Sequence, residues 1–593
     1  MSGKKKEMGS AVARKSSLIA GRTGRMAFVY IGSTVCSATV TLINSLVAGI
    51  SLGSDALAAI AAAGPLLALE QILHCMYGIG IDKLMVRSVG KGDRREANRI
   101  FGAVLIAVLI LYLLVLVPIL VFEQPLLSLF IKDEALVGMM IDYTLPQLAL
   151  SPVFECLLCV ERAFRVDGRA RLLSKRGIVT NVTTILFDIL FVSILGMDLS
   201  GLAWASVIGS ALGYTLPLSH FFSKKRTVKP DFSVILSFRE FLYYIKEDLR
   251  MGNPGTVDEI MDGIALGAQT AVVGIIGGSG GLAIWAVFKS LRGVVLSIAN
   301  GASASVCVHT GLLYGQKDYE GVRYSVRESV KIALVTSVCT AVFVLVLPGL
   351  IADLHQIGAE LRPLCVQCLR IGCAVFPALA LLTVVCAYLP TVEKLGLTNT
   401  LVLIQKGLSI VAAAAAYYVG LQSFFAGYVL AVWTAAIVLI VLLIRDRHWF
   451  VPERNPETIG SYSIRLRSDW ISALSVIVQE KLTGFSDAAE FNSRVALVLE
   501  DGLNYIAQQN PEKEINTDIE IKHAGDGVLM TIIDDGRAYS PLPELAREDP
   551  GKPGALEAAV VLGLSAEVNY DRVLDLNDLN LHVKPIAPGR SAE

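Results

Sequence analysis

The sequence predicts an all-α polytopic membrane protein with twelve transmembrane helices in two six-helix lobes, followed by a C-terminal α/β two-layer sandwich. Three observations lead to this fold class. Of the 593 residues, 54% are hydrophobic and only 18% are charged, which is too apolar for a single soluble globule. The chain after residue 444 differs, because its 15 basic and 25 acidic residues give it an ordinary soluble composition. The apolar part also contains an internal repeat.

The first expected element is a basic cytoplasmic segment, residues 1–25. The apolar run that follows it lacks a convincing small-residue cleavage site, so we interpret that run as an uncleaved first span. Apolar stretches long enough to cross a bilayer follow at 26–50, 55–80, 98–122, 136–160, 176–196, 200–222, 252–276, 281–306, 328–352, 363–389, 397–419 and 424–444. They form an N-lobe at 26–222 and a C-lobe at 252–444, joined by a cytoplasmic loop at 223–251.

Lysines and arginines are distributed unevenly between alternate loops. If the amino terminus is cytoplasmic, the loops predicted outside carry only Lys132 and Arg362. Because basic loops stay on the cytoplasmic side, we expect both termini in the cytoplasm and the chain in the inner (plasma) membrane. A linker at 445–460 would then lead to a cytoplasmic domain at 461–586.

The two lobes repeat at an offset of 225 residues. The pairs that agree on this offset are residues 53–54 and 278–279, the loops 89–93 and 314–318, and Pro152 and Pro377. A six-helix unit copied in tandem has the same topology twice, which places two lobes about an axis along the membrane normal with a cavity between them. This architecture is typical of a transporter rather than a channel or a receptor.

Ionisable side chains inside the membrane need a partner or a function. Asp262 lies ten residues into the expected span 252–276, about 15 Å deep at about 1.5 Å per residue, and Asp258 and Glu259 share its helical face. A carboxylate in a low-dielectric site is suited to exchange H⁺ or bind Na⁺. We therefore expect these acids to couple transport to a cation or to contact substrate; the alternative is a structural ion pair with a C-lobe cation.

Other polar residues in the predicted spans are candidates for the cavity: Asn44, Glu70, Asp188, Lys289, Arg292, Arg370 and Lys406. Glu70 and His74 are four residues apart on one helical face, and they either line the cavity or pair with each other. The four C-lobe cations suit an anionic or zwitterionic substrate, or else they pair across helices.

Three stretches occur in a fixed order along the membrane part: residues 42–59, the repeated loop beginning at Gly90, and residues 181–203. Together they make residues 26–444 resemble the multidrug and toxic compound extrusion (MATE) transporters. The resemblance implies a secondary exporter that swaps a small organic substrate, such as a xenobiotic, for H⁺ or Na⁺ by rocking two lobes. It also places Asp262, eight residues after Pro254, at the cation-coupling acid. Asp188 matches a position that is often acidic or amide and serves either coupling or helix packing.

Asn44 stands where many members of that family have an aspartate. An amide cannot titrate, so the resemblance leaves Asn44 two roles, to ligate Na⁺ or to hydrogen-bond substrate.

After residue 460 the apolar runs give way to the alternation of a soluble domain. We expect a strand at 463–467, helices at 470–481 and 490–509, and a hairpin over 518–533 that turns at 524–527.

Two motifs in this domain suggest nucleotide chemistry. Glu500 and Asn504 lie four residues apart on one helix, so Glu500 is placed to orient a water or hydroxyl as the catalytic residue while Asn504 offers an oxygen to Mg²⁺. The turn from Asp534 to Gly536 lets backbone approach a flat ligand, with Asp534 accepting from an adenine amino group.

These motifs resemble the histidine-kinase-like ATPase fold, in particular the anti-sigma-factor serine kinases. The resemblance implies an ATP/Mg²⁺ site at Asn504, Asp534 and Gly536 with a lid that includes Gly554, and a small cytoplasmic regulatory protein as partner. Because the lid is short, nucleotide binding is expected more than phosphoryl transfer. The domain has no basic, aromatic-rich surface for nucleic acid.

Three functions are compatible with the sequence. The first is a cation-coupled exporter with a nucleotide-binding regulatory domain. The second is a membrane receptor whose tail is a serine kinase output, and the third is a flippase for an anionic lipid-linked substrate.

Overall fold

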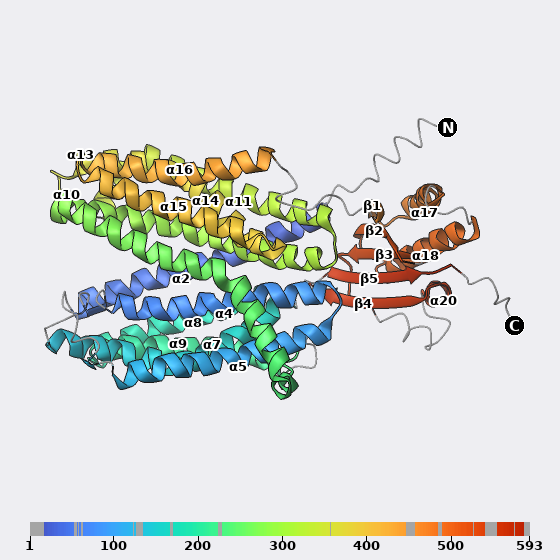
Figure 1. Cartoon of the computed structure of the whole chain (residues 1–593), viewed down its shortest axis with the longest axis horizontal. Coiled ribbons are helices and arrows are strands. Elements are labelled where there is room, and N and C mark those ends of the chain that lie inside the picture. Colours follow the sequence, from blue (N-terminus) through green and yellow to red (C-terminus); the bar gives the residue numbers. More distant parts are fainter. Residues whose placement is uncertain are drawn as a thin grey trace. The chain divides into compact units, whose positions relative to one another are not determined.

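A computed structural model describes residues 17–52, 56, 59–60, 63–122, 124–125, 134–166, 170–222, 228–355, 357–445, 457–483, 489–525, 527–539, 554–573 and 576–585 (Figure 1). Its contacts divide the chain into a helical unit, Thr23–Gln316 with Ser325–Val451, and a smaller unit that contains Pro452–Glu593.

The helical unit consists of two bundles. The first holds α2 (Ser17–Ser51), α4 (Gly64–Gly90), α5 (Arg94–Val121), α7 (Glu134–Val166), α8 (Ala170–Asp188) with the π-helical η1 (Ile189–Ile194), and α9 (Leu199–Phe221). The turn η2 (Phe232–Leu236) leads to the second, which holds α10 (Phe238–Gly315), α11 (Tyr319–Val346), α12 (Pro348–Leu354), α13 (Arg362–Gly372), η3 (Cys373–Val375), α14 (Phe376–Tyr388), η4 (Leu389–Val392), α15 (Leu395–Ala416) and α16 (Leu421–Arg445).

Within the described residues, ten helical segments are long and apolar enough to span a membrane. Two of them, Phe238–Gly278 and Gly280–Gly315, are the arms of α10, which bends where Gly278 adopts φ 56°. The expected span 26–50 lies on α2, and residues 64–80 of the expected span 55–80 lie on α4; neither helix is among the ten. In α4 the polar side chains Glu70, Gln71 and His74 interrupt the apolar run.

Two helices begin earlier than the hydropathy pattern predicts. The expected loop at 223–251 contains η2 and the start of α10, and the expected basic segment 1–25 contains the start of α2. Hydropathy marks the edge of the membrane, whereas backbone hydrogen bonds carry a helix on into water. The early part of α10 is held against α5, where Arg99 Nη1 lies 3.2 Å from Glu240 Oε2.

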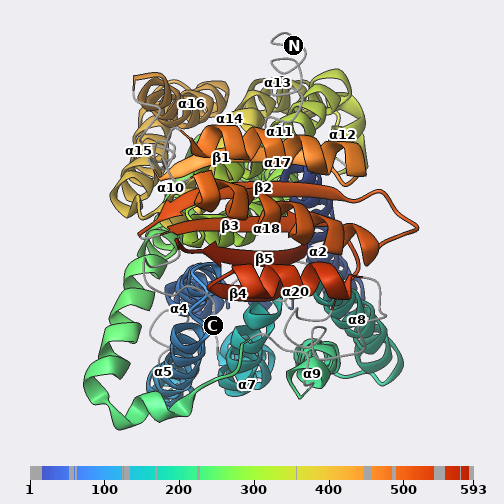
Figure 2. The same ribbon diagram turned by 90° about the vertical axis from the view of Figure 1, so that its right-hand side faces the viewer.

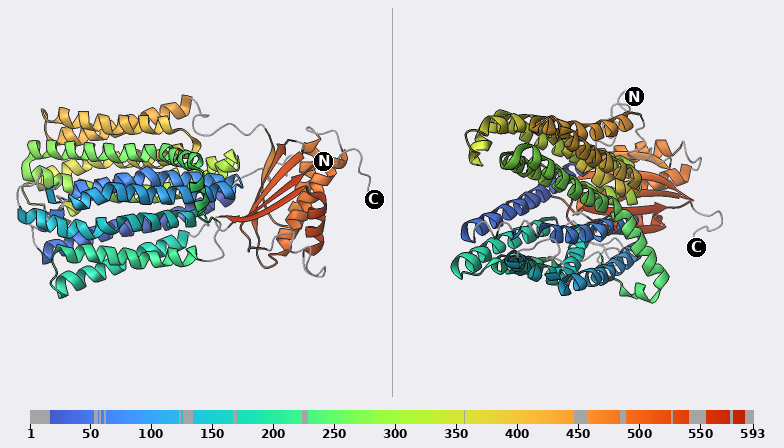
Figure 3. Two further views of the ribbon diagram at one scale, coloured as in Figure 1. Left: turned by 60° about the horizontal axis from the view of Figure 1, so that its bottom comes forward. Right: turned by 60° about the vertical axis from the view of Figure 1, so that its left-hand side comes forward.

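The two bundles meet through symmetric contacts between repeated residues. A Cβ added at Gly90 would collide with the carbonyl oxygen of Leu312, and a Cβ added at Gly315 would collide with that of Arg87. Gly90 and Gly315 are 225 residues apart, as are Arg87 and Leu312, so the repeat relates the two contacts. The ion pair between Arg87 and Glu393 joins the bundles at this end, and away from it the bundles diverge (Figure 3).

The smaller unit contains a five-stranded antiparallel sheet in the order β1-β2-β3-β5-β4. Its strands are β1 (Thr458–Arg465), β2 (Asn516–Ala524), β3 (Gly527–Asp534), β4 (Glu567–Val573) and β5 (Leu576–Val583). The helices α17 (Ser468–Leu482), α18 (Ala489–Gln508) and α20 (Ala555–Leu564) cover one face (Figure 2). Alternate apolar residues of β2, β3 and β5 form the core with α18. The expected linker 445–460 lies largely outside the described residues, and β1 begins within its last part.

Candidate functional site

Asp262 lies between two cations of the second bundle. The bend at Gly278 folds α10 back on itself, so Arg292 Nη2 comes within 2.8 Å of Asp262 Oδ1. Lys406, on α15, also forms an ion pair with Asp262, and its Nζ lies 3.7 Å from Asp258 Oδ1. The carboxylate therefore neutralises two largely buried cations, which is the ion pair that the sequence left as the alternative to coupling.

The expected basic cluster is only partly assembled. Among the described residues Arg292 and Lys406 contact Asp262. Lys289 is half-buried about one turn before Arg292 on α10, near enough for the two like charges to repel, and Arg370 is exposed on α13. Glu259 is half-buried on α10. Helical spacing defines the face of a residue but not the rotation of its helix against its neighbours, so the sequence did not show which of the four cations contact Asp262.

Two candidates lie in the first bundle. Asn44 is on α2, and its side chain is outside what the structure describes. Asp188 is fully buried at the junction of α8 and η1.

His74 does not pair with Glu70, contrary to one of the two expectations for these residues. Its Nδ1 lies 3.0 Å from Glu155 Oε2, and its Nε2 lies 2.9 Å from Arg162 Nη2. A neutral imidazole that donates from Nδ1 and accepts at Nε2 satisfies both contacts. Arg162 continues the network to Asp82 at 2.5 Å. Glu70 is half-buried. His74 pairs with Glu155 of α7 instead, and residue spacing along α4 cannot reveal a partner that comes from another helix.

A cavity of about 300 Å³ lies between the bundles, lined by α4, α7, α10, α14, η4 and α15. Its charged lining residues are Asp82, Lys83, Arg162 and Asp258. The sequence singled out only Asp258, because the other three fall beyond the apolar stretches 55–80 and 136–160. The helical periodicity of the sequence continues past residue 80. This could have placed Asp82 and Lys83 on the same helix as the second span.

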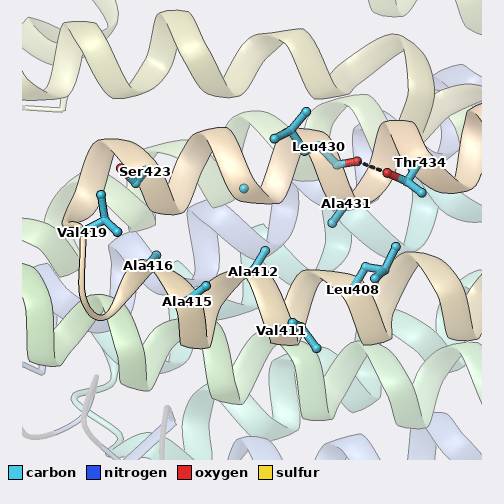
Figure 4. A pocket seen from close by; sticks show the side chains of 11 residues that line it. Leu408, Val411, Ala412, Ala415, Ala416, Val419, Ser423, Leu430, Ala431 and Thr434 are labelled. Carbon is cyan, nitrogen blue, oxygen red and sulfur yellow. Dashed lines mark hydrogen bonds between the residues drawn. The ribbon is translucent and has the colours of Figure 1, made fainter.

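A second, larger groove lies between α15 and α16 (Figure 4). Its volume is about 380 Å³, and small apolar side chains such as Ala412, Ala415 and Ala431 line it. The hydroxyl of Thr434 donates a hydrogen bond to the carbonyl oxygen of Leu430 on the same helix. None of the described residues that line this groove is ionisable, so these residues do not provide charge-coupled chemistry.

In the smaller unit the predicted nucleotide residues are placed by α18 and β3. Glu500 accepts a hydrogen bond from Ser472 Oγ at 2.8 Å, and Asn504 is half-buried one turn further on. Gly554 begins α20 with φ 86°, where a Cβ would lie 2.8 Å from the ring of Tyr505. Glycine is therefore required at this position for two independent reasons.

Asp534 is buried and already hydrogen-bonded. Its Oδ1 accepts from the backbone N–H of Gly536 at 2.8 Å and from Asn577 Nδ2 at 2.7 Å. Its Oδ2 accepts from the Tyr539 hydroxyl at 3.3 Å, and the Tyr539 ring lies between those of Tyr505 and Tyr570. A ligand amino group would have to displace the Tyr539 hydroxyl, the longest of these three bonds.

Burial of Asp534 should make the stability of this domain depend on pH. Burial raises the pKa of Asp534 from 3.8 to about 6. Between these values the folded domain binds more protons than the unfolded chain, so the contribution of Asp534 to stability falls as pH rises. It is fully present below about pH 4 and lost above about pH 6, about 3 kcal/mol in all.

Hydrogen exchange of β3 peptides in the full-length protein, corrected for intrinsic rates, measures this contribution. Wild type should lose protection relative to the Asp534→Asn variant as pH rises from about 4 to about 6. A parallel response of the two proteins over this range would contradict the prediction.

The comparisons with known proteins concern the helical unit. The MatE family model matches residues 27–191 and 267–415. The solved structure of an outward-facing multidrug resistance MATE family transporter of the MOP superfamily has a TM-score of 0.67 and 19% identity, covering 74% of this chain and 99% of that chain. The comparison with curated proteins gave no match.

Two further structures have the same fold. A MOP superfamily transporter from Pyrococcus furiosus, described as having a binding pocket of reverse polarity, has a TM-score of 0.66 and 19% identity over 74% of this chain and 99% of that chain. A Vibrio cholerae MATE transporter has a TM-score of 0.66 and 19% identity over 73% of this chain and 99% of that one.

Proposed function

The chain belongs to the MATE family of secondary transporters, and from this premise we propose that it is an antiporter that exports small organic molecules in exchange for Na⁺ or H⁺. We propose twelve spans, with α2 and α4 as the first two, in the inner membrane with both termini cytoplasmic. The observation that carries the proposal is Asp262, the carboxylate held between Arg292 and Lys406.

The geometry suggests how an ion would act at this site. Binding of H⁺ or Na⁺ to Asp262 cancels the charge that holds Lys406, and Lys406 already lies 3.7 Å from a second carboxylate, Asp258. A shift of Lys406 toward Asp258 would change the charge facing the cavity, which Asp258 lines. Ion binding and substrate binding would thus compete through one lysine, as antiport requires.

The expected test is efflux from proteoliposomes that contain the full-length protein. Ethidium and radiolabelled 4-aminobutyrate serve as a cationic and a zwitterionic probe. Under an imposed Na⁺ or H⁺ gradient, at least one probe should leave against its own gradient, and only one of the two ions should support this. Equal loss from protein-free vesicles would contradict the proposal.

We further propose that the tail binds ATP with Mg²⁺ and regulates transport, with Asn504 as the metal contact and Asp534, Gly536 and Gly554 around the nucleotide. Glu500 would act as the base if phosphate is transferred to a small cytoplasmic regulatory protein. The support is that Glu500 and Asn504 lie on one face of α18 and that Gly554 opens α20. Tyr539 must leave Asp534 before adenine binds there.

The competition between Tyr539 and adenine gives a specific prediction. Tyr539→Phe removes the 3.3 Å hydrogen bond to Asp534 but keeps the ring, so the affinity for ATP should rise about fivefold, equivalent to about 1 kcal/mol. Titration of the full-length protein with a fluorescent ATP analogue measures this. Asp534→Asn should weaken binding instead; unchanged affinity in both variants would exclude Asp534 from the nucleotide site.

A further inference from the structure

The cavity between the bundles contains a buried lysine, Lys83, and no described carboxylate forms an ion pair with it. Lys83 lines the cavity from α4 and is only 6% exposed. No hydrogen bond or ion pair reaches its ammonium group from the described residues. An unpaired ammonium in such a site costs several kcal/mol, so the site favours an anionic group beside Lys83.

The acid next to Lys83 in sequence attracts it only at longer range, because a different cation binds that acid directly. Asp82, the neighbour of Lys83 in sequence, is engaged by Arg162 at 2.5 Å, and Arg162 is held in turn by His74. Arg162 also interacts with the buried carboxylate Asp248, so this cation is already balanced by acids of the protein. Lys83 is therefore the cation that a ligand would neutralise.

Asp258, on α10, lines the same cavity and has carboxylate oxygens available to accept further hydrogen bonds. The side chain of Asp258 is 53% exposed, and its contact with Lys406 is 3.7 Å long, while Lys406 is also bound by Asp262. Asp258 thus keeps acceptor positions for a ligand cation. The amide of Asn300, also in the lining, offers a further hydrogen-bonding group.

We propose that this cavity binds a small zwitterion, with its carboxylate at Lys83 and its ammonium at Asp258. A neutral zwitterion pairs with both groups without adding net charge to the cavity, which limits the electrostatic cost of burial. The volume of about 300 Å³ is at the lower limit for ligand sites and suits an amino acid with few carbon atoms. The claim that the zwitterion is a transported substrate rests on the proposed function. The claim that the cavity binds a zwitterion does not.

Calorimetric titration of the full-length protein in detergent tests the inference. The probes are β-alanine, 4-aminobutyrate and 6-aminohexanoate, which differ in the separation of their charges, with butyrate and butylammonium as single-charge controls. At least one zwitterion should bind at least about tenfold more tightly than both controls. Lys83→Gln and Asp258→Asn should each raise its Kd at least about tenfold. Lys331→Gln, a change at an exposed lysine of α11, should leave the Kd unchanged.

Each outcome is informative about one claim. Zwitterion binding that Lys83→Gln does not weaken, tighter binding of butylammonium, or no binding of any zwitterion would overturn the inference. Thermal unfolding of each variant confirms that it is folded before titration. If gradient-driven efflux of ethidium persists without zwitterion binding, the inference fails while the antiporter stands. If a zwitterion binds at Lys83 but no probe moves under either gradient, the binding site stands and the antiporter fails.

Discussion

Asp262→Asn is expected to reduce gradient-driven efflux from proteoliposomes to the level of protein-free vesicles. The amide does not titrate and carries no charge to attract Na⁺, so the coupling ion loses its site. Efflux of the probe under the imposed gradient is the measurement. Because the substitution also leaves Arg292 and Lys406 without their shared counter-charge, it should lower stability by about 3–5 kcal/mol.

A matched double variant separates coupling from charge balance. In Asp262→Asn/Lys406→Gln one carboxylate and one ammonium are removed together, so the net charge of the site is kept. If Asp262 couples transport, the double variant should regain stability without regaining efflux. Recovery of gradient-driven efflux in the double variant would show that Asp262 is only a structural partner of Lys406.

Gly315→Ala is expected to destabilise the end at which the bundles converge. The new Cβ would collide with the carbonyl of Arg87, and backbone cannot move aside as a flexible side chain can. Overpacking of this kind costs about 1–3 kcal/mol, which lowers the population of the converged state by a factor of about 5 to 150. Gly90→Ala should have the same effect through the carbonyl of Leu312, because the repeat relates the two contacts.

Hydrogen exchange of peptides that contain residues 87–90 and 312–315 measures this opening. Both variants should exchange faster there, and efflux should fall because the bundles no longer close at this end. Gly267→Ala is the control, since its Cβ would have no heavy atom within 4 Å. If Gly90→Ala and Gly315→Ala exchange like Gly267→Ala, the contact does not hold the bundles together.

The predictions from sequence succeeded where one chain segment determines the outcome. Apolar length located the long helices, and the turn at Gly525, with φ 56°, lies where the hairpin was expected. Contacts between segments were harder to predict. His74 pairs with Glu155, 81 residues away, rather than with the nearby Glu70. Asp534 accepts hydrogen bonds from Tyr539 and Asn577, which its position in the sequence did not reveal.

The charged cavity was missed for a related reason. Hydropathy ended the second and fourth spans before Lys83 and Arg162, although both helices continue past these residues. From the sequence alone, polar residues at the end of a long helix are expected to be exposed to solvent. Here α10, α14 and α15 pack against them and enclose them in a cavity.

Reverse coupling tests the antiporter most directly, because an antiporter must convert a substrate gradient into ion movement. Proteoliposomes at zero membrane potential and equal internal and external Na⁺ and pH receive a steep gradient of ethidium or 4-aminobutyrate, while internal dyes report pH and Na⁺. We predict that downhill movement of one probe drives one of the two ions in the opposite direction, and that Asp262→Asn abolishes this. Probe movement without ion movement would contradict coupling and favour a flippase, and no movement of either would favour a receptor.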